Sequence, residues 1–208
     1  MNTTIYLIRH SVPFKEHRGI ELIDDDILSW NMKSPLSIEG EEISKEYFKK
    51  KEFRNIDVVW SSSYVRAMST AKYIAYHNHL KVNVASIFNE RIHGINNWDE
   101  LPSNFEKRQL EDETYKIGNG ESRKEVKERM LQGINKLLEE YKGKNIAIIG
   151  HATSFAFLLS NWCKIEGNYS YKDKIFFDGN WNYLETFKLT FDEYNNLINI
   201  KNLYHNYN

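Results

Sequence analysis

The chain has 208 residues, of which 41% are hydrophobic, and its 28 Lys and Arg nearly balance its 29 Asp and Glu, for a formal net charge of −1. This length and apolar content predict one folded domain over residues 1–208 rather than a disordered chain. The balanced charge argues against a protein that binds nucleic acid through overall basicity. With Cys163 as the one cysteine, an intramolecular disulfide and a multi-cysteine metal site are excluded.

The N-terminal residues lack the pattern of a secretory signal peptide, because no basic stretch precedes the apolar run that ends at Arg9. Other apolar runs, such as 155–159, are far shorter than the roughly 18 residues of a membrane span. We therefore expect a cytoplasmic protein that binds neither membrane nor nucleic acid. The sequence leaves the oligomeric state open.

The first half of the chain alternates apolar β-type runs with helical patterns. Residues 4–8 predict a buried strand, and a helix over 38–53 follows an irregular segment. A second strand is predicted at 56–60, a helix at 64–79 and a third strand at 82–87.

After a second irregular segment, 88–120, the alternation continues. Ser122 and Glu125 have the spacing of a capping box, which predicts the start of a helix that ends at Gly143. A fourth strand is predicted at 145–149, and a helix follows over 155–162. Two further strands are expected around a turn at 192–193, within residues 182–204.

Strands that alternate with helices indicate an α/β fold with a mostly parallel sheet. We predict a three-layer αβα sandwich, to which the C-terminal hairpin adds antiparallel edge strands.

Ligand sites in open α/β sheets lie beyond the carboxyl ends of the strands, and ionisable residues gather at these positions here. They are Arg9, His10 and Ser11 after the first strand, Arg66 beyond the second, Glu90 and Arg91 after the third, and His151 after the fourth. Arginine forks and the helix N-terminus that follows His151 suit phosphate oxygens. A neutral histidine is a nucleophile towards phosphorus, and a carboxyl group can exchange protons with the leaving group and with water. The residues alone predict phosphoryl transfer without a metal or cofactor, and leave open which histidine is the nucleophile.

Six segments, in order along residues 5–160, resemble the motifs of the histidine phosphatase superfamily, also called the phosphoglycerate mutase-like family. They are LIRHS at 7–11, PLSIEG at 35–40, SSYVRAMSTA at 62–71, NERIHG at 89–94, GES at 120–122 and GH at 150–151. The resemblance implies the family's fold and its phosphatase branch. No segment after about residue 160 resembles a motif of the family.

The resemblance also implies a role for each matching residue. His10 would be the phosphorylated nucleophile, Glu90 the general acid and base, and the phosphoryl oxygens would be held by Arg9, Arg66 and His151. We further expect Ser11, His17, Arg91 and Ala152 to contact the substrate.

Three residues depart from the family pattern. Ser11 replaces a glycine, which is a cost if that position needs a positive φ, although its hydroxyl could instead donate to phosphate. Pro13 replaces a serine or threonine, and Glu16 stands where the mutase-like branch has an asparagine. The interaction that this asparagine would make must then come from another residue, such as His17 or Ser11.

Structural alternatives exist for several of these residues. His10 could be a hydrogen-bonded core residue, and Arg66 could form a surface ion pair. Glu100 and Glu106 are alternatives to Glu90 because they lie in the same irregular segment. The pair His77 and His79 and the acidic run 24–26 are expected to be solvated rather than metal-binding. Three aromatic residues of the irregular segments either belong to the core or line a substrate pocket: Trp30, Trp98 and Phe105.

The leading functional hypothesis is a metal-independent phosphomonoesterase that acts on a small phosphorylated metabolite through a phosphohistidine. A phosphoglycerate mutase is the alternative within the same chemistry, but family mutases tend to be longer and Glu16 favours hydrolysis. A non-catalytic phospholigand-binding module is a further alternative, which the complete set of chemical residues argues against. Lys15, Arg18 and Arg91 could form a local basic rim, and the identity of the phosphomonoester stays open.

Overall fold

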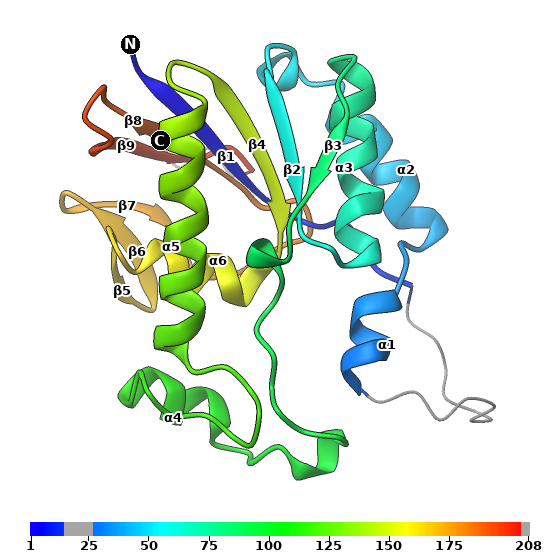
Figure 1. Cartoon of the computed structure of the whole chain (residues 1–208), viewed down its shortest axis with the longest axis vertical. Helices are drawn as coiled ribbons and strands as arrows, with labels where there is room; N and C mark the ends of the chain where they lie inside the picture. The colour runs from blue at the N-terminus through cyan, green and yellow to red at the C-terminus, as the bar shows by residue number, and fades with distance from the viewer. Residues whose placement is uncertain (15–26, 205–208) are drawn as a thin grey trace.

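The computed structural model describes residues 1–14 and 27–204, and its centre is a six-stranded sheet with the order β3-β2-β4-β1-β8-β9 (Figure 1). Four strands run parallel: β1 (Thr3–Arg9), β2 (Val58–Ser61), β3 (Val82–Val84) and β4 (Asn145–Gly150). The C-terminal hairpin of β8 (Thr186–Phe191) and β9 (Leu197–Asn202) extends the sheet in the antiparallel sense, with β8 paired to β1. The predicted edge hairpin is therefore confirmed.

Helices cover both faces of the sheet, as the three-layer prediction requires (Figure 1). One face packs against α2 (Ile38–Tyr47) and α3 (Val65–His77), and the other against α5 (Arg123–Glu140) and α6 (Ala152–Leu159). Successive side chains of a strand point to opposite faces. β1 is therefore almost continuously apolar, because both of its faces are buried.

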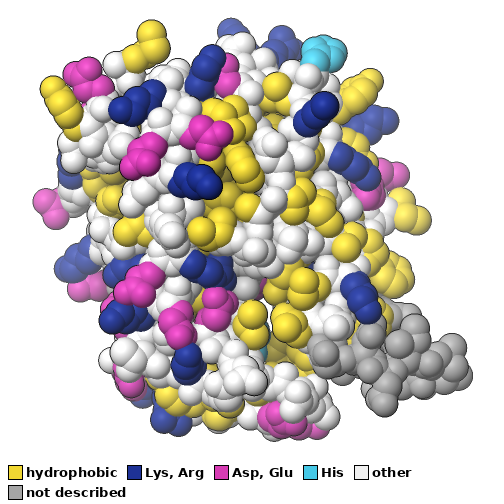
Figure 2. All heavy atoms as spheres, viewed as in Figure 1, with side chains coloured by type: hydrophobic (Ala, Val, Ile, Leu, Met, Phe, Trp, Pro, Cys, Tyr) yellow, Lys and Arg dark blue, Asp and Glu magenta, His cyan; other side chains and the backbone are white. Residues whose placement is uncertain are grey.

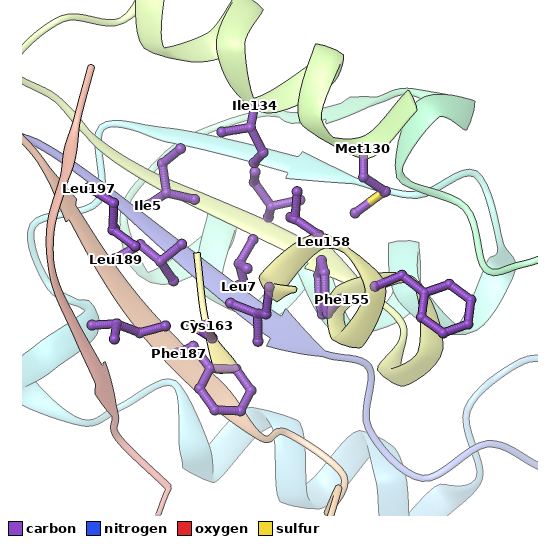
Figure 3. Close-up of a cluster of buried hydrophobic side chains, with 14 of the residues drawn as sticks. Ile5, Leu7, Met130, Ile134, Phe155, Leu158, Cys163, Phe187, Leu189 and Leu197 are labelled. Carbon is purple, nitrogen blue, oxygen red and sulfur yellow. The ribbon is translucent and has the colours of Figure 1, made fainter. Parts of the chain in front are cut away.

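The two cores divide the residues of β1 between them. Tyr6 and Ile8 belong to the core under α2 and α3, whereas Ile5 and Leu7 belong to the core under α5 and α6. Figure 3 shows Ile5 and Leu7 packed with Leu158 in that second core. Truncation of such fully buried side chains to alanine typically costs about 2–5 kcal/mol of stability, so these contacts fix the position of the strand that ends at the site.

Two helix starts follow the local sequence. Ser122 Oγ accepts a hydrogen bond from the Glu125 N–H at 3.2 Å, and the Glu125 carboxylate accepts from the Ser122 N–H at 2.8 Å. The predicted capping box is thus confirmed. Ser37 caps α2 in the same way, since its Oγ accepts from the Gly40 N–H at 3.0 Å.

Two elements give way to 3-10 turns before their predicted ends. The helix predicted over 38–53 ends at Tyr47 and is followed by a 3-10 turn, η1 (Lys51–Phe53), because the chain turns there to bury Phe48 and Phe53 in one aromatic cluster. The strand predicted over 82–87 ends at Val84, and a second 3-10 turn, η2 (Ser86–Phe88), packs Phe88 into the core.

The segments expected to be irregular contain short elements that the sequence did not predict. These are α1 (Ile27–Lys33), the 3-10 turn η3 (Trp98–Glu100) and α4 (Phe105–Glu111). A second, three-stranded sheet is formed by β5 (Lys164–Glu166), β6 (Asn168–Tyr171) and β7 (Lys174–Phe177). Each strand has only three or four residues, too few for a hydrophobic period, and the sheet depends on packing of Tyr169 and Phe177 against the main core.

No helix in the described part of the chain is long and apolar enough to cross a membrane. Figure 2 shows Lys and Arg side chains interspersed with Asp and Glu on the face that it presents, in keeping with the balanced composition.

Candidate active site

The carboxyl ends of β1, β2 and β4 meet at one edge of the sheet. The His10 N–H donates to the Gly150 carbonyl at 2.9 Å, and the Ser62 N–H donates to the Ile149 carbonyl at 2.9 Å. The imidazole rings of His10 and His151, far apart in the sequence, consequently lie with their centroids 5.2 Å apart. The structure thus brings together the two histidines that the sequence placed at strand ends.

Arg66, in the first turn of α3, joins the two imidazoles. Its Nε donates to His10 Nε2 at 3.0 Å, and its Nη2 contacts His151 Nδ1 at 3.3 Å. A guanidinium has only donors, so both of these ring nitrogens must be acceptors. The remaining proton of His10 lies on Nδ1, which donates to the Ser11 carbonyl at 2.7 Å.

The tautomer of His151 follows by the same reasoning. Its protonated nitrogen is Nε2, which donates to Ser62 Oγ at 2.7 Å. Burial of the ring lowers the pKa of His10 well below its usual value, and the positive charge of Arg66 lowers it further. Burial likewise lowers the pKa of His151, with smaller contributions from His10 and Arg66. Both histidines are therefore neutral near pH 7, and His10 carries a free electron pair on Nε2.

Arg9 approaches the site from the end of β1. Its guanidinium carbon lies 4.4 Å from the centroid of the Tyr183 ring, and its Nη1 donates to the Trp181 carbonyl at 2.6 Å. Its Nε is buried and has no hydrogen-bond partner among the described residues. Burial lowers the pKa of Arg9, yet the group stays a cation.

Glu90 follows η2 and reaches the first turn of α6. Its Oε1 accepts from the Ser154 N–H at 2.9 Å and from the Arg91 N–H at 2.9 Å, while its Oε2 accepts from the Thr153 N–H at 3.2 Å. A helix N-terminus stabilises such a carboxylate. Glu90 therefore occupies the helix N-terminus at Ala152, whose donors the sequence assigned to the substrate.

The loop that carries Glu90 is held by an ion pair. Glu121 accepts from Arg129 Nε at 2.6 Å and Nη2 at 2.9 Å, and also from the Ile92 N–H at 3.0 Å. Arg129 in turn donates to the carbonyls of Ile87 at 2.8 Å and of Glu90 at 3.3 Å. The GES segment at 120–122 thus caps α5 and also braces the loop of the candidate acid.

Ser11, the departure from the family's glycine, needs no unusual backbone, because it is not among the described residues with positive φ. Its hydroxyl donates to the Gly40 carbonyl at 2.8 Å, and its N–H donates to Thr70 Oγ1 at 3.0 Å. A Cβ built on Gly40 would lie 2.1 Å from the Val12 carbonyl oxygen. The PLSIEG segment therefore holds the turn after His10, and the Ser11 hydroxyl faces this turn rather than a phosphate site.

Arg91 also differs from the expectation. It forms a bidentate ion pair with Glu106, at 2.9 and 2.7 Å, and also donates to Gln109 Oε1 at 2.6 Å and to His93 Nε2 at 2.8 Å. With 2% of its surface exposed, it braces the segment around α4. We therefore remove Arg91 from the substrate contacts, and its partner Glu106 from the candidate acids.

Several sequence-based expectations lie outside the described residues. These are the roles considered for Lys15, Glu16, His17, Arg18 and the acidic run 24–26. In the described ranges 1–14 and 27–204, no group of three or more His, Cys, Asp and Glu side chains could hold a metal ion.

Four residues of the site were not predicted. Ser62 lies inside a recognised motif, so its place beside His151 could have been proposed. The carbonyl of Asn31 in α1 accepts a hydrogen bond from Arg66 Nη1, and Trp181 and Tyr183 contact Arg9. These contacts depend on tertiary packing, which no sequence pattern predicts.

Two neutral imidazoles and two arginines thus lie at the carboxyl edge of a mostly parallel sheet in an α/β protein, and these are groups whose chemistry suits the oxygens of a phosphoryl group. Residues 5–189 match the family model of the histidine phosphatase superfamily (branch 1). The chain therefore belongs to this family.

Solved structures share the fold over nearly the whole chain. Mycobacterial glucosyl-3-phosphoglycerate phosphatase superposes with a TM-score of 0.69 and 16% identity, covering 98% of this chain and 98% of that one. A phosphoserine phosphatase of Entamoeba histolytica, solved as a mutant with phosphoserine, has a TM-score of 0.64 and 15% identity, with 96% of each chain covered. No curated protein matches the sequence significantly.

Proposed function

We propose that this protein is a metal-independent phosphomonoesterase that hydrolyses a small phosphorylated metabolite through a phosphohistidine on His10. The observation that carries the proposal is the state of His10: its Nδ1 donates to a carbonyl, and its Nε2 electron pair faces Arg66. A ring fixed in this tautomer needs no deprotonation before it attacks phosphorus.

In the first step, His10 Nε2 forms a bond to phosphorus while the bond from phosphorus to the ester oxygen breaks. Negative charge develops on the equatorial oxygens in this step, and the guanidinium groups of Arg9 and Arg66 stabilise it. A further hydrogen bond to these oxygens comes from His151 Nε2–H, or from the hydroxyl of Ser62, which His151 contacts. Glu90, in its protonated form, gives its proton to the departing alkoxide.

In the second step, a water molecule attacks the phosphorus of phosphohistidine, and the P–N bond breaks. Glu90, now a carboxylate, takes a proton from this water, which restores the acid for the next cycle. Inorganic phosphate leaves, and His10 is again neutral. Neither step requires a group beyond the side chains at this edge of the sheet.

A small phosphorylated metabolite is favoured as substrate because proteins of the same fold are named as phosphatases of glucosyl-3-phosphoglycerate and of phosphoserine. Both compounds join one phosphate to a small carboxylate-bearing group. At 15–16% identity these names support the substrate class alone.

The test is hydrolysis of p-nitrophenyl phosphate by the full chain, with EDTA present, and by its His10→Ala variant. We expect turnover by the wild type and at least a thousandfold loss in the variant. A brief reaction with a radiolabelled substrate, quenched in base, should leave an acid-labile label on the wild type only.

Wild-type turnover no higher than that of His10→Ala would overturn the proposal. A panel of phosphorylated metabolites, ranked by kcat/KM, then identifies the substrate. The same panel includes 3-phosphoglycerate primed with 2,3-bisphosphoglycerate, and isomerisation that greatly exceeds hydrolysis would replace the phosphatase with a mutase.

A further inference from the structure

Four arginines of the described residues, in and around the site, are held in two different ways. Arg91 and Arg129 form bidentate ion pairs with Glu106 and Glu121. Within the described residues, Arg9 and Arg66 have no carboxylate at ion-pair distance, and each guanidinium lies over a tyrosine ring. Arg91 also lies over a ring, that of Phe105 at 5.0 Å, but it has a carboxylate partner in addition. The distances from guanidinium carbon to ring centroid are 4.4 Å for Arg9 on Tyr183 and 4.9 Å for Arg66 on Tyr64.

This difference matches what each arginine must do. A carboxylate partner would neutralise the guanidinium and occupy the N–H groups that a phosphoryl group needs. The face of an aromatic ring attracts the positive charge of a guanidinium, but it accepts no hydrogen bond from the N–H groups that point outward in the guanidinium plane. Within the described residues, no carboxylate therefore neutralises the charge of Arg9. Its Nε, like that of Arg91, is buried and has no hydrogen-bond partner there.

The Tyr183 ring is presented by a turn of unusual backbone. Leu184, the next residue, is 1% exposed and has a φ of 62°, a conformation that costs a bulky side chain roughly 1–2 kcal/mol. Beside it, the buried Glu185 accepts from the Asn182 N–H at 3.2 Å and from Asn202 Nδ2 at 2.7 Å. The surrounding hydrogen bonds thus hold a strained turn in place.

The turn is also bonded directly to the end of β1. The Arg9 N–H donates to the Glu185 carbonyl at 2.9 Å, and the Leu184 N–H reaches the His10 carbonyl at 3.4 Å. The Tyr183 ring consequently lies beside both residues, with its centroid 5.9 Å from that of His10. Backbone strain recurs at functional sites, and here the strained residue, Leu184, directly follows the tyrosine whose ring lies at Arg9.

We propose that Tyr183 is a positioning residue, whose ring holds the Arg9 guanidinium beside His10 and so keeps Arg9 available for the phosphoryl group. The inference rests on the proposed function, since it assigns Tyr183 to the same phosphoryl site. The ring face does this, and the hydroxyl is dispensable.

The experiment compares Tyr183→Phe with Tyr183→Leu in the full chain. Binding of inorganic phosphate is measured by calorimetry, and inhibition of p-nitrophenyl phosphate hydrolysis is measured with orthovanadate. We expect Tyr183→Phe to stay within about twofold of wild type, and Tyr183→Leu to bind both anions roughly fivefold to twentyfold more weakly. Tyr194→Leu, at an exposed tyrosine of the β8–β9 turn, is the matched control and should equal wild type.

Weaker anion binding by Tyr183→Leu at the Tm of wild type is a result that a merely structural role of the side chain would not give. Equal losses in the Phe and Leu variants would assign the effect to the hydroxyl and overturn the inference, as would wild-type binding by Tyr183→Leu. If Tyr183→Leu does not fold, Tyr183→Trp and Tyr183→Met replace it, and Trp must bind at least tenfold more tightly than Met.

The outcomes also separate the two proposals. If the wild type binds inorganic phosphate but hydrolyses no phosphomonoester, the proposed function is wrong. The phosphate affinities of the Tyr183 variants still test the role of Tyr183 in that case. Hydrolysis by the wild type with an unchanged Tyr183→Leu variant defeats only the role of Tyr183.

Discussion

Arg66 Nε lies 3.0 Å from His10 Nε2, so the guanidinium donates a hydrogen bond to the atom that we propose as nucleophile. The arginine thus keeps the proton off Nε2 in the resting site, both by occupying the electron pair and by its charge. In the mechanism that we propose, the phosphoryl group takes over these donors as it approaches, and its phosphorus is thereby aligned with the imidazole.

The first prediction concerns the pKa of His10. Arg66→Gln removes the positive charge that helps to lower this pKa, so the pKa of His10 should rise. NMR titration of labelled histidine measures it, and kcat/KM should fall at least a hundredfold. Arg54→Gln, at an exposed arginine outside the site, is the control. An unchanged His10 titration would contradict the electrostatic role of Arg66.

The second prediction separates the two steps through Glu90. Glu90→Gln cannot protonate a leaving group, so hydrolysis of an alkyl phosphate should fall by roughly 10²–10⁴-fold. Hydrolysis of p-nitrophenyl phosphate should fall less, because nitrophenolate leaves without a proton. Glu100→Gln, in the same part of the chain, should change neither rate, and equal losses for both substrates in Glu90→Gln would exclude Glu90 as the acid.

The third prediction uses two glycines as a matched pair. A Cβ at Gly40 would lie 2.1 Å from the Val12 carbonyl oxygen, so Gly40→Ala should destabilise the fold by about 1–3 kcal/mol and displace the turn after His10. At Gly167, whose φ is +78°, a Cβ meets no atom within 4 Å, so Gly167→Ala should cost only about 1–2 kcal/mol of backbone strain. Denaturant unfolding gives the stabilities. Activity should fall in Gly40→Ala alone.

The fourth prediction concerns the brace on the acid loop. Arg129→Met removes the donors to the carbonyls of Ile87 and Glu90, and leaves Glu121 without its ion-pair partner. We expect at least a tenfold loss of kcat and a stability loss of roughly 1–3 kcal/mol. Lys124→Met, which breaks an exposed pair with Glu128 on the same helix, should cost under about 0.5 kcal/mol and leave kcat intact.

The fifth prediction is a loss of stability in acid. Burial lowers the pKa of His93 to about 4 and also lowers the pKa values of His10 and His151, whereas an unfolded histidine titrates near pH 6.5. Below about pH 6.5 the unfolded chain therefore binds more protons than the folded chain, and the free energy of unfolding falls as the pH drops towards about 4.

Denaturant unfolding between about pH 4 and 7.5 measures this slope. His93→Asn should flatten it, and His79→Asn, at an exposed histidine with positive φ that asparagine tolerates, should not. A free energy of unfolding that is constant over this range would contradict the burial of neutral histidines.

The sequence predicted the sheet and its histidines well because their positions depend on local rules. Parallel strands end at the same edge, so the residues that follow them gather there. His10 and His151 are direct neighbours because β1 and β4 pair with each other, an adjacency that the sequence did not predict. The motif resemblance chose His10 as the nucleophile, which stays a prediction until the phosphohistidine is sought.

The errors arose where a side chain had two possible partners. Arg91 follows Glu90 in the sequence and so pointed to the substrate, but Glu106 and Gln109 on α4 provide a buried site for it. α4 has seven residues and no marked period, so its side chains could not be placed in advance. The Tyr183 contact likewise depends on a turn that follows the unpredicted sheet β5–β7.

Helix α1 buries none of its side chains, yet the carbonyl of Asn31 accepts a hydrogen bond from Arg66. A backbone carbonyl is present whatever the side chain, so substitutions in α1 keep the hydrogen bond to Arg66 as long as the helix itself forms. α1 is consequently a suitable place for libraries that seek new substrates, because none of its side chains is fully buried and it adjoins Arg66, which we propose to hold the phosphoryl group.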